Sequence, residues 1–486
     1  MKVSLFLLLV LNMLFMPQIV TAAAPVNHRL IVLTDIEADP DDTESLVRLL
    51  VYANVLDIEG LIATTSTHMR NEVHPASILR VIDGYRKVRP CLLRHEPGFP
   101  RAEQLTRLVK AGLPVYGMQG VGEGKDSEGS DWIVTALADN DPRPLWVAVW
   151  GGSNCLAQAL YKISHTRSEA AVAKMIAKLR VYTISDQDDS GQWIRTTYPG
   201  LFYIVSPGGY GGSIWAAITE RAPGFNNEVI SNAWIARNIQ QGHGPLGALY
   251  PDVAYGMEGD TPSWLSLIPN GLNAPEHPDW GGWGGRYALS TPGLADIDAA
   301  GFTGGVPVEP ETRPIWANAT DRVLPIVHNV IGRAQDCDSV ALTGFKQTLW
   351  RWREDLQNDF AARMDWCTMP YAQANHPPVP VLAHPDTITI RSGGTYILDA
   401  MGSTDPDGDN LSFLWFPYPE AGSGKHTATI AGAWNIAHVQ ITAPVVESPE
   451  TIHIILKVTD KGSPGLSRYK RVILTVLPAG AGSGQH

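Results

Sequence analysis

The sequence predicts an α/β domain with a doubly wound, mostly parallel sheet, followed by an Ig-like β-sandwich. Two patterns support this prediction. Between residue 29 and about residue 206, short β-branched runs alternate with amphipathic helical segments, as in parallel sheets with crossover helices. Beyond residue 380, about seven short alternating runs have the count and spacing of a sandwich. A chain of 486 residues is long enough for both domains.

The α/β domain is predicted over residues 27–372. We expect strands over 30–33, 58–63, 146–149 and 179–184, and helices over 43–54, 75–87 and 154–163. A last helix over 340–363 is expected to close the domain. Between about 207 and 330 the chain is rich in Gly, Pro, Trp and Asn, and loops this long inside a compact domain are usually functional.

A Pro-rich linker over 373–379 leads into the sandwich, which is predicted over 380–478. Its strands are expected over 387–390, 395–398, 412–416, 427–430, 439–442, 451–459 and 469–476. The string from Gly402 to Trp415 resembles the turn and following strand of PKD-like and cadherin-like modules. For the acidic turn in this string we favour a structural role over calcium binding.

Residues 1–22 combine an early cation, an apolar block and a small-residue ending, which is the pattern of a removable signal peptide. We therefore expect the protein to be secreted or periplasmic. The formal charge of -12 argues against nucleic acid and anionic lipid as partners, and no second apolar run is long enough to cross a membrane. A carbohydrate or glycoside fits better, with cellulose among the candidates. The sequence predicts no particular oligomeric state.

The first predicted strand runs directly into five carboxylates, those of Asp35, Glu37, Asp39, Asp41 and Asp42. So many like charges are costly unless a cation or a polyhydroxyl ligand accepts them. Capping of the following helix by Asp41 or Asp42 is the alternative, and it accounts for one of these residues but not for five. The cluster therefore predicts a functional site.

A second acidic loop follows the strand over 179–184 and contains Asp186, Asp188 and Asp189, with Trp193 and Arg195 shortly after. Such a set can hold sugar hydroxyls, although a solvated turn is an equally weighted alternative. A polar turn that ends at His68 follows another strand. Because the carboxyl ends of parallel strands meet at one edge of a sheet, these loops are expected to converge.

The long loops supply further candidates. His243, Glu258 and Asp260 lie beside glycines, and for each of them proton transfer or metal binding competes with a structural role. Trp280 and Trp283 lie in a Gly-rich string, where core packing is the expected role and sugar stacking the alternative. The chain has no serine elbow, P-loop, His-Glu-x-x-His or Cys-x-x-Cys motif, so serine esterase, phosphoryl transfer and zinc chemistry have no support.

Four segments appear in the order used by nucleoside hydrolases: Leu33 to Asp42, Ile62 to Ser66, Val149 to Asn154, and His243 to Leu246. The chain resembles more closely a family of secreted bacterial proteins labelled cellulose-binding, which joins a nucleoside hydrolase-like domain to a small β-sandwich. The segments that carry this second resemblance are Asp35 to Asp42, Ser185 to Asp189, and Glu258 to Ser263. It covers nearly the full mature length.

The resemblance to nucleoside hydrolases implies a calcium ion at the strand-end aspartates, where the metal helps an aspartate to activate water. Carried over by position, Asp42 is expected to be a metal ligand and Asp41 an acceptor for sugar hydroxyls. Either Asp35 or Glu37 is expected to be the metal ligand that also acts as the base.

The same resemblance gives the backbone carbonyl of Trp150 as a metal ligand, with Asn154 in the turn after it. One departure concerns Gly244, which follows His243 where the hydrolases have an aspartate ligand. Either the metal is absent, or the lost oxygen is supplied by Glu37, Asp260 or Asp189.

We expect an exported glycosyl hydrolase whose first domain cleaves a C–N or C–O bond at a sugar anomeric carbon. Asp35 or Glu37 is expected to activate water, and His243 or Glu258 to assist the leaving group. Substrate contacts are expected from Asp39, Asp41, His68, Asn154, Asp186, Asp188, Asp189, Trp193, Arg195 and Asp260. Two alternatives stay open: a non-catalytic protein that binds cellulose or another plant polysaccharide, and an adhesion or scaffold module.

Overall fold

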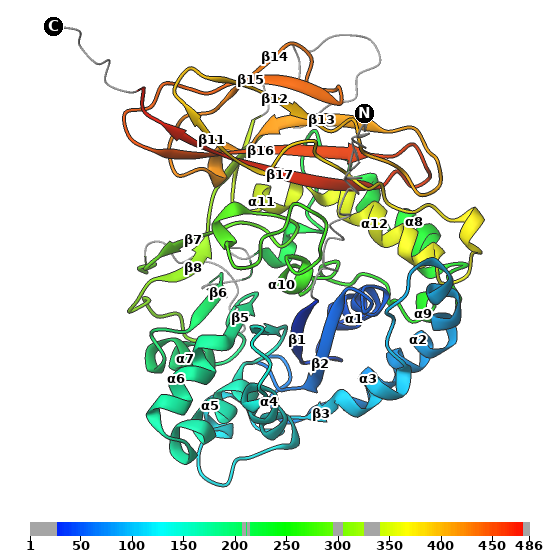
Figure 1. The fold of residues 1–486 in the computed structure, drawn as a ribbon. Helices are drawn as coiled ribbons and strands as arrows, with labels where there is room; N and C mark the ends of the chain where they lie inside the picture. Colours follow the sequence, from blue (N-terminus) through cyan, green and yellow to red (C-terminus); the bar gives the residue numbers. More distant parts are fainter. Residues whose placement is uncertain (1–26, 207–209, 211–213, 295–304, 325–340, 480–486) are drawn as a thin grey trace, which may run out of the picture.

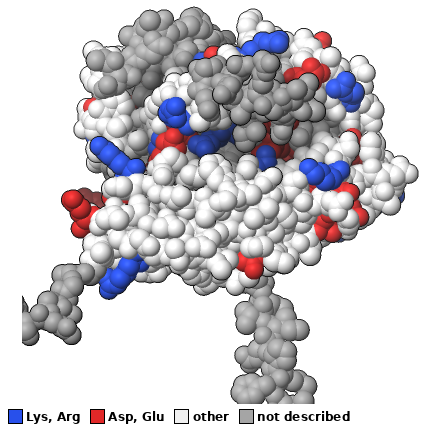
Figure 2. Space-filling view, turned by 90° about the horizontal axis from the view of Figure 1, so that it is seen from above, with Lys and Arg blue, Asp and Glu red and all other residues white. Residues whose placement is uncertain are grey.

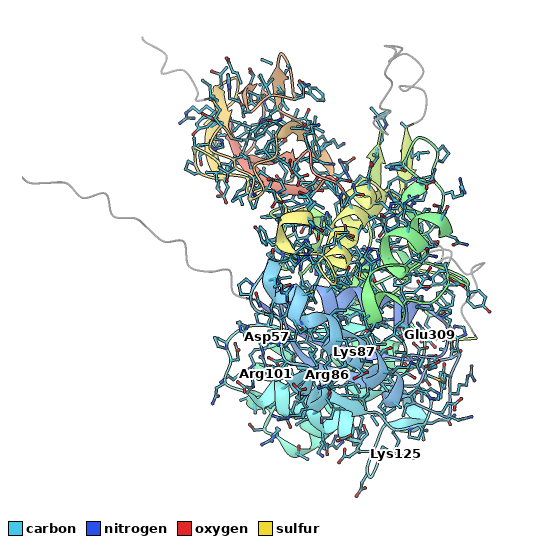
Figure 3. All side chains as sticks on the ribbon, turned by 90° about the vertical axis from the view of Figure 1, so that its right-hand side faces the viewer. Asp57, Arg86, Lys87, Arg101, Lys125 and Glu309 are labelled. Atoms are coloured by element: carbon cyan, nitrogen blue, oxygen red, sulfur yellow. The ribbon has the colours of Figure 1, made fainter. Side chains whose placement is uncertain are left out.

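The computed structural model describes residues 27–206, 210, 214–294, 305–324 and 341–479. The predicted signal peptide over 1–22 lies outside these residues. The described part contains an α/β domain and a β-sandwich, which lies against one end of it (Figures 1 and 3). Among the described residues, no helix has the length and apolar character needed to span a membrane.

An eight-stranded sheet with the order β3-β2-β1-β4-β5-β6-β8-β7 forms the centre of the α/β domain. Its pairings are parallel except for the antiparallel pair β7 and β8. The doubly wound, mostly parallel sheet is thereby confirmed. The strands are β1 His28–Thr34, β2 Leu56–Ala63, β3 Val109–Ala111, β4 Leu145–Val149, β5 Leu179–Thr183, β6 Phe202–Val205, β7 Tyr287–Ser290 and β8 Ile315–Asn318.

Helices cover both faces of this sheet because alternate side chains of each central strand point to opposite sides. In β1, Leu30 and Val32 belong to one buried apolar cluster, whereas Ile31 and Leu33 belong to the other. The longer helices are α1 Asp41–Val51, α2 Pro75–His95, α3 Ala102–Leu108, α4 Glu128–Ala138, α5 Asn154–Thr166, α6 Glu169–Lys178, α7 Ser190–Thr197 and α12 Arg353–Asp365.

Short elements fill the long connections. They are η1 Gly117–Gly120, η3 Ile214–Ala217, η4 Glu228–Ile230, α8 Asn232–Ile235, η5 Ala236–Gln240, α9 Gly244–Gly247, α10 Pro262–Leu265, η6 Pro278–Trp280, α11 Gln347–Trp350 and η8 Tyr371–Gln373, with the strands β9 Asp321–Val323 and β10 Leu342–Gly344.

The prediction of one helix over 340–363 is wrong. Its first part pairs as strand β10 with β9, and two separate helices, α11 and α12, follow. Trp350 is the last residue of α11 and Trp352 is the cap residue before α12, and both are buried. Burial of both rings explains why the apolar pattern looked continuous.

The seven predicted strands of the sandwich are confirmed. One sheet has the order β11-β17-β16-β13 and the other has the order β12-β15-β14. Their bounds are β11 Thr387–Arg391, β12 Thr395–Asp399, β13 Ser412–Pro417, β14 Thr429–Ala431, β15 His438–Thr442, β16 Glu450–Thr459 and β17 Ser467–Leu477, with a short helix η9 Pro419–Ala421.

The four-stranded sheet of the sandwich packs on helix α12 of the α/β domain (Figure 1). Tyr418, Ile455 and Tyr469 belong to the larger apolar cluster of the α/β domain. Asp355 on α12 accepts hydrogen bonds from Lys457 at 2.5 Å and Ser467 at 3.1 Å, and also from the hydroxyl of Tyr469. Shared apolar and polar contacts therefore hold the two domains together.

Candidate functional site

A cavity of about 560 Å³ opens at the carboxyl ends of the central strands. Neighbouring strands β1 and β4 lead in opposite directions across the sheet, and α/β proteins usually bind ligands at such a switch point. The cavity is lined by Asp35, Ala38, Asp39, Asp41, Asp42, His68, Gln187, Tyr210, Trp215, Tyr255 and Asp260. The predicted convergence of the strand-end loops is therefore confirmed for the first acidic loop and the turn at His68.

A tight connection between β1 and α1 positions the first acidic loop. The amide of Ala38 donates to the carbonyl of Asp35 at 2.9 Å, and the amide of Asp41 donates to the Asp39 carboxylate at 3.0 Å. Pro40 caps α1 without a side-chain hydrogen bond, and Asp41 and Asp42 lie in the first turn of the helix. Capping by Asp41 or Asp42, the alternative from the sequence, is therefore wrong.

Burial and mutual repulsion set the charge state of the cluster. Burial raises the pKa of Asp35 to about 7, although a hydrogen bond from Ser66 opposes this shift. Burial also raises the pKa values of Asp41, Asp42 and Asp260 well above the usual range, and the neighbouring carboxylates raise them further. These carboxyl groups retain protons near neutral pH unless a positive charge compensates them.

The oxygen atoms of the cluster suit a hard cation. Asp39, Asp41 and Asp42 each offer a carboxylate oxygen, and these atoms lie within 4.8 Å of one another. Repulsion from Asp42 and then from Asp35 contributes to the raised pKa of Asp260, so these three carboxyl groups are close neighbours. Oxygen-only donors are the ligands that calcium takes in proteins. Among the replacements considered for the aspartate missing at Gly244, Asp260 is the one that lines the cavity.

The loop that carries Asp260 is fixed against α1 from behind the cavity. Glu258, in a left-handed conformation with φ 53°, is completely buried and pairs with Arg48 at 2.7 Å. The hydroxyl of Tyr250 donates to Glu258 at 2.9 Å, and the amide of Glu258 donates to the carboxyl group of Glu44 at 2.7 Å. Glu258 therefore positions the loop and does not line the cavity, so this geometry gives no support to its assignment to the leaving group.

Aromatic side chains that sequence reasoning missed form another part of the cavity wall. The indole nitrogen of Trp215 donates to Asp41 at 2.8 Å, and its ring lies 5.7 Å from that of Tyr210. The hydroxyl of Tyr210 lies 2.8 Å from Nε2 of His68. Tyr255 lies in the lining with 76% of its surface exposed. The pattern that could have indicated Tyr210 is the Gly-Gly-Tyr-Gly-Gly string, which follows a strand of the parallel sheet.

Gln187 is the second missed residue type. Its side-chain nitrogen donates to the carbonyl of Trp150, and its main-chain carbonyl accepts from the amide of Thr67 at 2.7 Å. The Trp150 carbonyl therefore already has a donor, and Trp150 is not among the lining residues. Its expected role as a metal ligand receives no support from this geometry.

The second acidic loop is mainly structural. Asp188 is buried and accepts from the amides of Asn154 at 3.1 Å and Ser190 at 2.9 Å, and burial raises its pKa to about 6. Asp189 accepts from the amide of Met118 at 2.8 Å. The side chain of Asn154 donates to Thr65 at 3.0 Å and to Val115 at 2.8 Å. These side chains connect loops behind the cavity, and their expected contacts with substrate are not supported.

The remaining members of that loop also point away from the cavity. Arg195 is buried between Asp186 and Glu311, with a separation of 2.7 Å to each. Trp193 packs on the apolar cluster beneath α7, edge-on to Tyr198. Asp186, Trp193 and Arg195 therefore stabilise the fold, and this geometry gives no support to their assignment to substrate binding.

Two further assignments are corrected. Glu37, with φ 87°, turns outward to the hydroxyl of Ser77 and pairs with Arg80 at 2.8 Å, and these contacts hold its pKa below the usual value. His243 lies 3.0 Å from Asp365 at the start of α9. Neither residue lines the cavity, so Glu37 is not supported as the base and His243 is not supported as the leaving-group acid.

The tryptophans of the Gly-rich string serve packing. Trp280 stacks on His277 with ring centroids 4.0 Å apart and meets His453 of the sandwich edge-on. Trp283 is completely buried beside Tyr469. Both rings therefore make the packing contacts expected from the sequence, and neither lines the cavity.

Two family matches cover most of the described chain. The family described as "Cellulose-binding Sde182, nucleoside hydrolase-like domain" matches residues 29–287, and the one described as "Cellulose-binding protein Sde0182, C-terminal domain" matches residues 395–476. The chain belongs to the Sde182 family. The cavity residues of this Sde182 member, from Asp35 to Asp260, all lie inside the first match.

A solved structure agrees with this membership. It is a nucleoside hydrolase-related hypothetical protein from Saccharophagus degradans, described as associated with carbohydrate metabolism. It shares 35% identity with the Sde182 member, covers 93% of this chain and 100% of that chain, and has a TM-score of 0.76. The fold class and the family resemblance expected from the sequence are therefore confirmed.

Two other solved structures are less similar in sequence and in fold. The PKD domain from KIAA 1837 protein has 19% identity, covers 21% of this chain and 92% of that chain, and has a TM-score of 0.16. The effector protein XOO4466 has 10% identity, covers 71% of this chain and 95% of that chain, and has a TM-score of 0.32. No curated protein matches the Sde182 member.

Proposed function

We propose that the α/β domain is an exported glycosyl hydrolase that cleaves a C–N or C–O bond at a sugar anomeric carbon. One observation carries this proposal: Asp35 is a buried carboxyl group with a pKa of about 7, on the wall of a cavity that also holds four other aspartates. A base with a pKa near the working pH combines the ionised state with the ability to take a proton.

In this proposal Asp35 accepts a proton from the attacking water. Asp41, oriented by the indole of Trp215, accepts hydrogen bonds from sugar hydroxyls. Bonds from 2-hydroxyl groups strengthen as positive charge develops on the sugar ring in an oxocarbenium-like transition state. The exposed ring of Tyr255 offers a face on which a sugar ring can stack.

The leaving group needs a proton donor, and His68 and Tyr210 are the candidates on the cavity wall. Their side chains are 2.8 Å apart, so a proton taken from one can be replaced through the other. Burial lowers the pKa of His68, which makes its protonated form a stronger acid. This pair takes the role that the sequence assigned to His243 or Glu258.

Calcium is the cation we propose for the cluster, held by Asp42 and Asp260 together with Asp35 or Asp39. When bound, it supplies positive charge that keeps neighbouring carboxylates ionised and polarises nearby oxygen atoms. Without that charge, the raised pKa values of Asp42 and Asp260 favour the protonated acids. Calcium binding is therefore expected to depend on pH, because protons and calcium compete for the same carboxylates.

Retention of a polysaccharide without turnover is the second candidate. The family descriptions name cellulose binding, and they favour a carbohydrate as the partner in either case. An uncharged polysaccharide is also compatible with the net charge of -12, because a neutral ligand is not repelled by a negatively charged protein.

A substrate screen separates the two candidates. Purified protein with calcium is incubated with nucleosides, aryl glycosides and plant glycans. The nucleobase or the reducing sugar that is released is then measured. Asp35→Asn keeps the shape of the side chain but removes the base, so we expect loss of turnover by about 100-fold or more. Asp386→Asn, on the exposed surface of the sandwich, is the matched control. Equal activity of Asp35→Asn and the native protein would refute the proposed base.

A further inference from the structure

Two histidines meet where the sandwich joins the α/β domain. His95 is the last residue of α2, and His376 lies in the linker that leads into the sandwich. Nδ1 of His95 lies 2.9 Å from Nε2 of His376. Both residues are buried, so the contact between the rings of this histidine pair is shielded from water. The number of protons that the histidine pair holds therefore decides whether the contact can form.

The outer nitrogen of each ring faces an oxygen acceptor. Nε2 of His95 lies 2.9 Å from the carbonyl of Met369, which can only accept a hydrogen bond. Nδ1 of His376 lies 3.0 Å from the carboxylate of Asp407, in the acidic turn of the sandwich. That carboxylate also accepts from the amide of His376 at 2.7 Å. The contacts therefore run from the α/β domain through the linker to the sandwich.

The number of hydrogens fixes the charge of the histidine pair. The three contacts need one hydrogen toward Met369, one between the rings and one toward Asp407. Two neutral imidazoles supply only two hydrogens. Two imidazolium ions would place one N–H group against another at the contact between the rings. The geometry therefore requires one additional proton, shared within this network.

The surroundings of the histidine pair favour a single positive charge. Trp366 stacks on both rings, with centroids 5.3 Å from His95 and 5.2 Å from His376. Tyr371 stacks on His376 at 3.9 Å, and aromatic faces attract a cation. Burial lowers the pKa of His95, the bond to Met369 opposes this shift, and the neighbouring His376 lowers the pKa further. A second proton on the histidine pair is therefore disfavoured.

Charged groups surround the histidine pair on every element that packs against it. They are Arg94 and Glu96 on either side of His95, Arg363 of α12 at 3.4 Å from Glu96, Asp405 and Asp407 of the acidic turn, and the hydroxyl of Tyr371. Carboxylates outnumber guanidinium groups in this set. Their net negative charge favours the additional proton.

We propose that the histidine pair is a pH-dependent contact, in which one shared proton holds the linker and the sandwich against helix α2. Loss of this proton leaves two nitrogen lone pairs facing each other, or leaves Met369 or Asp407 without its hydrogen bond. A second proton makes the two rings repel each other. The histidine pair acts independently of the proposed catalysis and of the carbohydrate partner.

The sign of the pH dependence follows from the number of bound protons. Two unfolded histidines, each with a pKa of about 6.5, together bind about one proton at pH 6.5, as many as the folded histidine pair. Below this pH the unfolded chain binds more protons than the folded pair, and above it fewer. The contribution of the histidine pair to stability is therefore largest near pH 6.5 and falls in both directions.

The test compares urea unfolding of the native full chain and the double variant His95→Gln/His376→Gln between pH 4.5 and pH 8.5, with a chelator present. Glutamine does not titrate, so the ratio of the two equilibrium constants for unfolding reports the proton held by the histidine pair. Near pH 6.5 the variant is expected to unfold about tenfold more readily or beyond, as for a lost charge-assisted bond. At both pH limits this ratio is expected to be smaller by about threefold or more.

The matched control is His438→Gln, at an exposed position of β15, and its ratio to the native chain is expected to stay constant with pH. Figure 2 looks onto the sandwich and shows a broad area with few charged side chains. Titration of this part of the surface therefore contributes little background to the comparison.

Asp407→Asn is the second variant, because Asp407 lies in an exposed turn and asparagine keeps the shape of its side chain. Its ratio to the native chain is expected to be largest near pH 6.5 and to shrink toward pH 8.5, where the native chain loses the shared proton. If the double variant does not fold, Asp407→Asn decides the test. Ratios that stay constant from pH 4.5 to pH 8.5 would overturn the inference, because a purely structural contact does not change with pH.

Discussion

Replacement of Asp35 by asparagine is expected to change how stability depends on pH. Burial raises the pKa of Asp35 to about 7 in the folded chain, against about 3.9 for an unfolded aspartate. Between these two values the folded chain keeps a proton that the unfolded chain has released. The free energy of unfolding therefore falls as pH rises through this window, with a slope of about 1.4 kcal/mol per pH unit for one such group.

The total change for Asp35 is about 4 kcal/mol between pH 4 and pH 7. This contribution is fully present below pH 4 and is lost as pH rises to about 7. Asparagine has nearly the same shape but does not titrate, so Asp35→Asn removes this one contribution. Other buried carboxyl groups with raised pKa values, such as Asp42, continue to titrate and leave a residual slope.

The assay is urea unfolding at several pH values, in the presence of a chelator so that no cation compensates the carboxylates. The native chain is expected to lose stability from pH 4 to pH 7 more steeply than Asp35→Asn, by about 1 kcal/mol per pH unit. Asp386→Asn, at an exposed position, controls for the loss of an ordinary aspartate. Parallel curves for the native chain and Asp35→Asn would refute the assignment of a buried, proton-retaining Asp35.

Three further predictions follow from other contacts. Trp215→Phe removes the indole donor to Asp41, and we expect ligand affinity measured by calorimetry to weaken about tenfold, as for a lost bond to a charged group; an unchanged affinity contradicts this role. Asp355→Ala leaves three donors of the sandwich without their acceptor. Scanning calorimetry is expected to show the two domains unfolding together, with a free energy of unfolding lower by about 3–5 kcal/mol. Independent unfolding of the two domains contradicts this prediction. Calcium is expected to raise the melting temperature more at pH 8 than at pH 5, because protons compete for the carboxylates, and Asp42→Asn is expected to abolish most of this effect; an equal rise at both pH values contradicts it.

Much of the fold followed from local pattern. Short β-branched runs predicted β1, β2, β4 and β5, and short alternating runs predicted all seven sandwich strands. Helices α3, α4 and α6 and the edge strand β3 were not predicted. Among the residues that the structure describes, α2 extends to His95 through Pro90, eight residues past the predicted end at 87.

The candidate site was predicted only in part. The strand-end aspartates and His68 reach the cavity because they follow strands whose carboxyl ends meet at one edge of the sheet. Asp260 reaches it from a long loop held by Glu44 and Arg48, contacts that have no signature in spacing. Tyr210 and Trp215 come from the Gly-rich connection after β6, whose sequence has no apolar periodicity from which their place in the cavity wall could be predicted.

The sequence by itself determined where apolar and acidic side chains cluster along the chain. It therefore determined the succession of predicted strands along the chain and the position of the first acidic loop. Only the tertiary structure decided which acidic groups are partnered and which face the cavity. Asp186 meets Arg195 and Glu37 meets Arg80, whereas Asp41, Asp42 and Asp260 meet one another. The physical reason is that a carboxylate takes its role from the charges and donors that surround it, and residues distant in the sequence supply most of these.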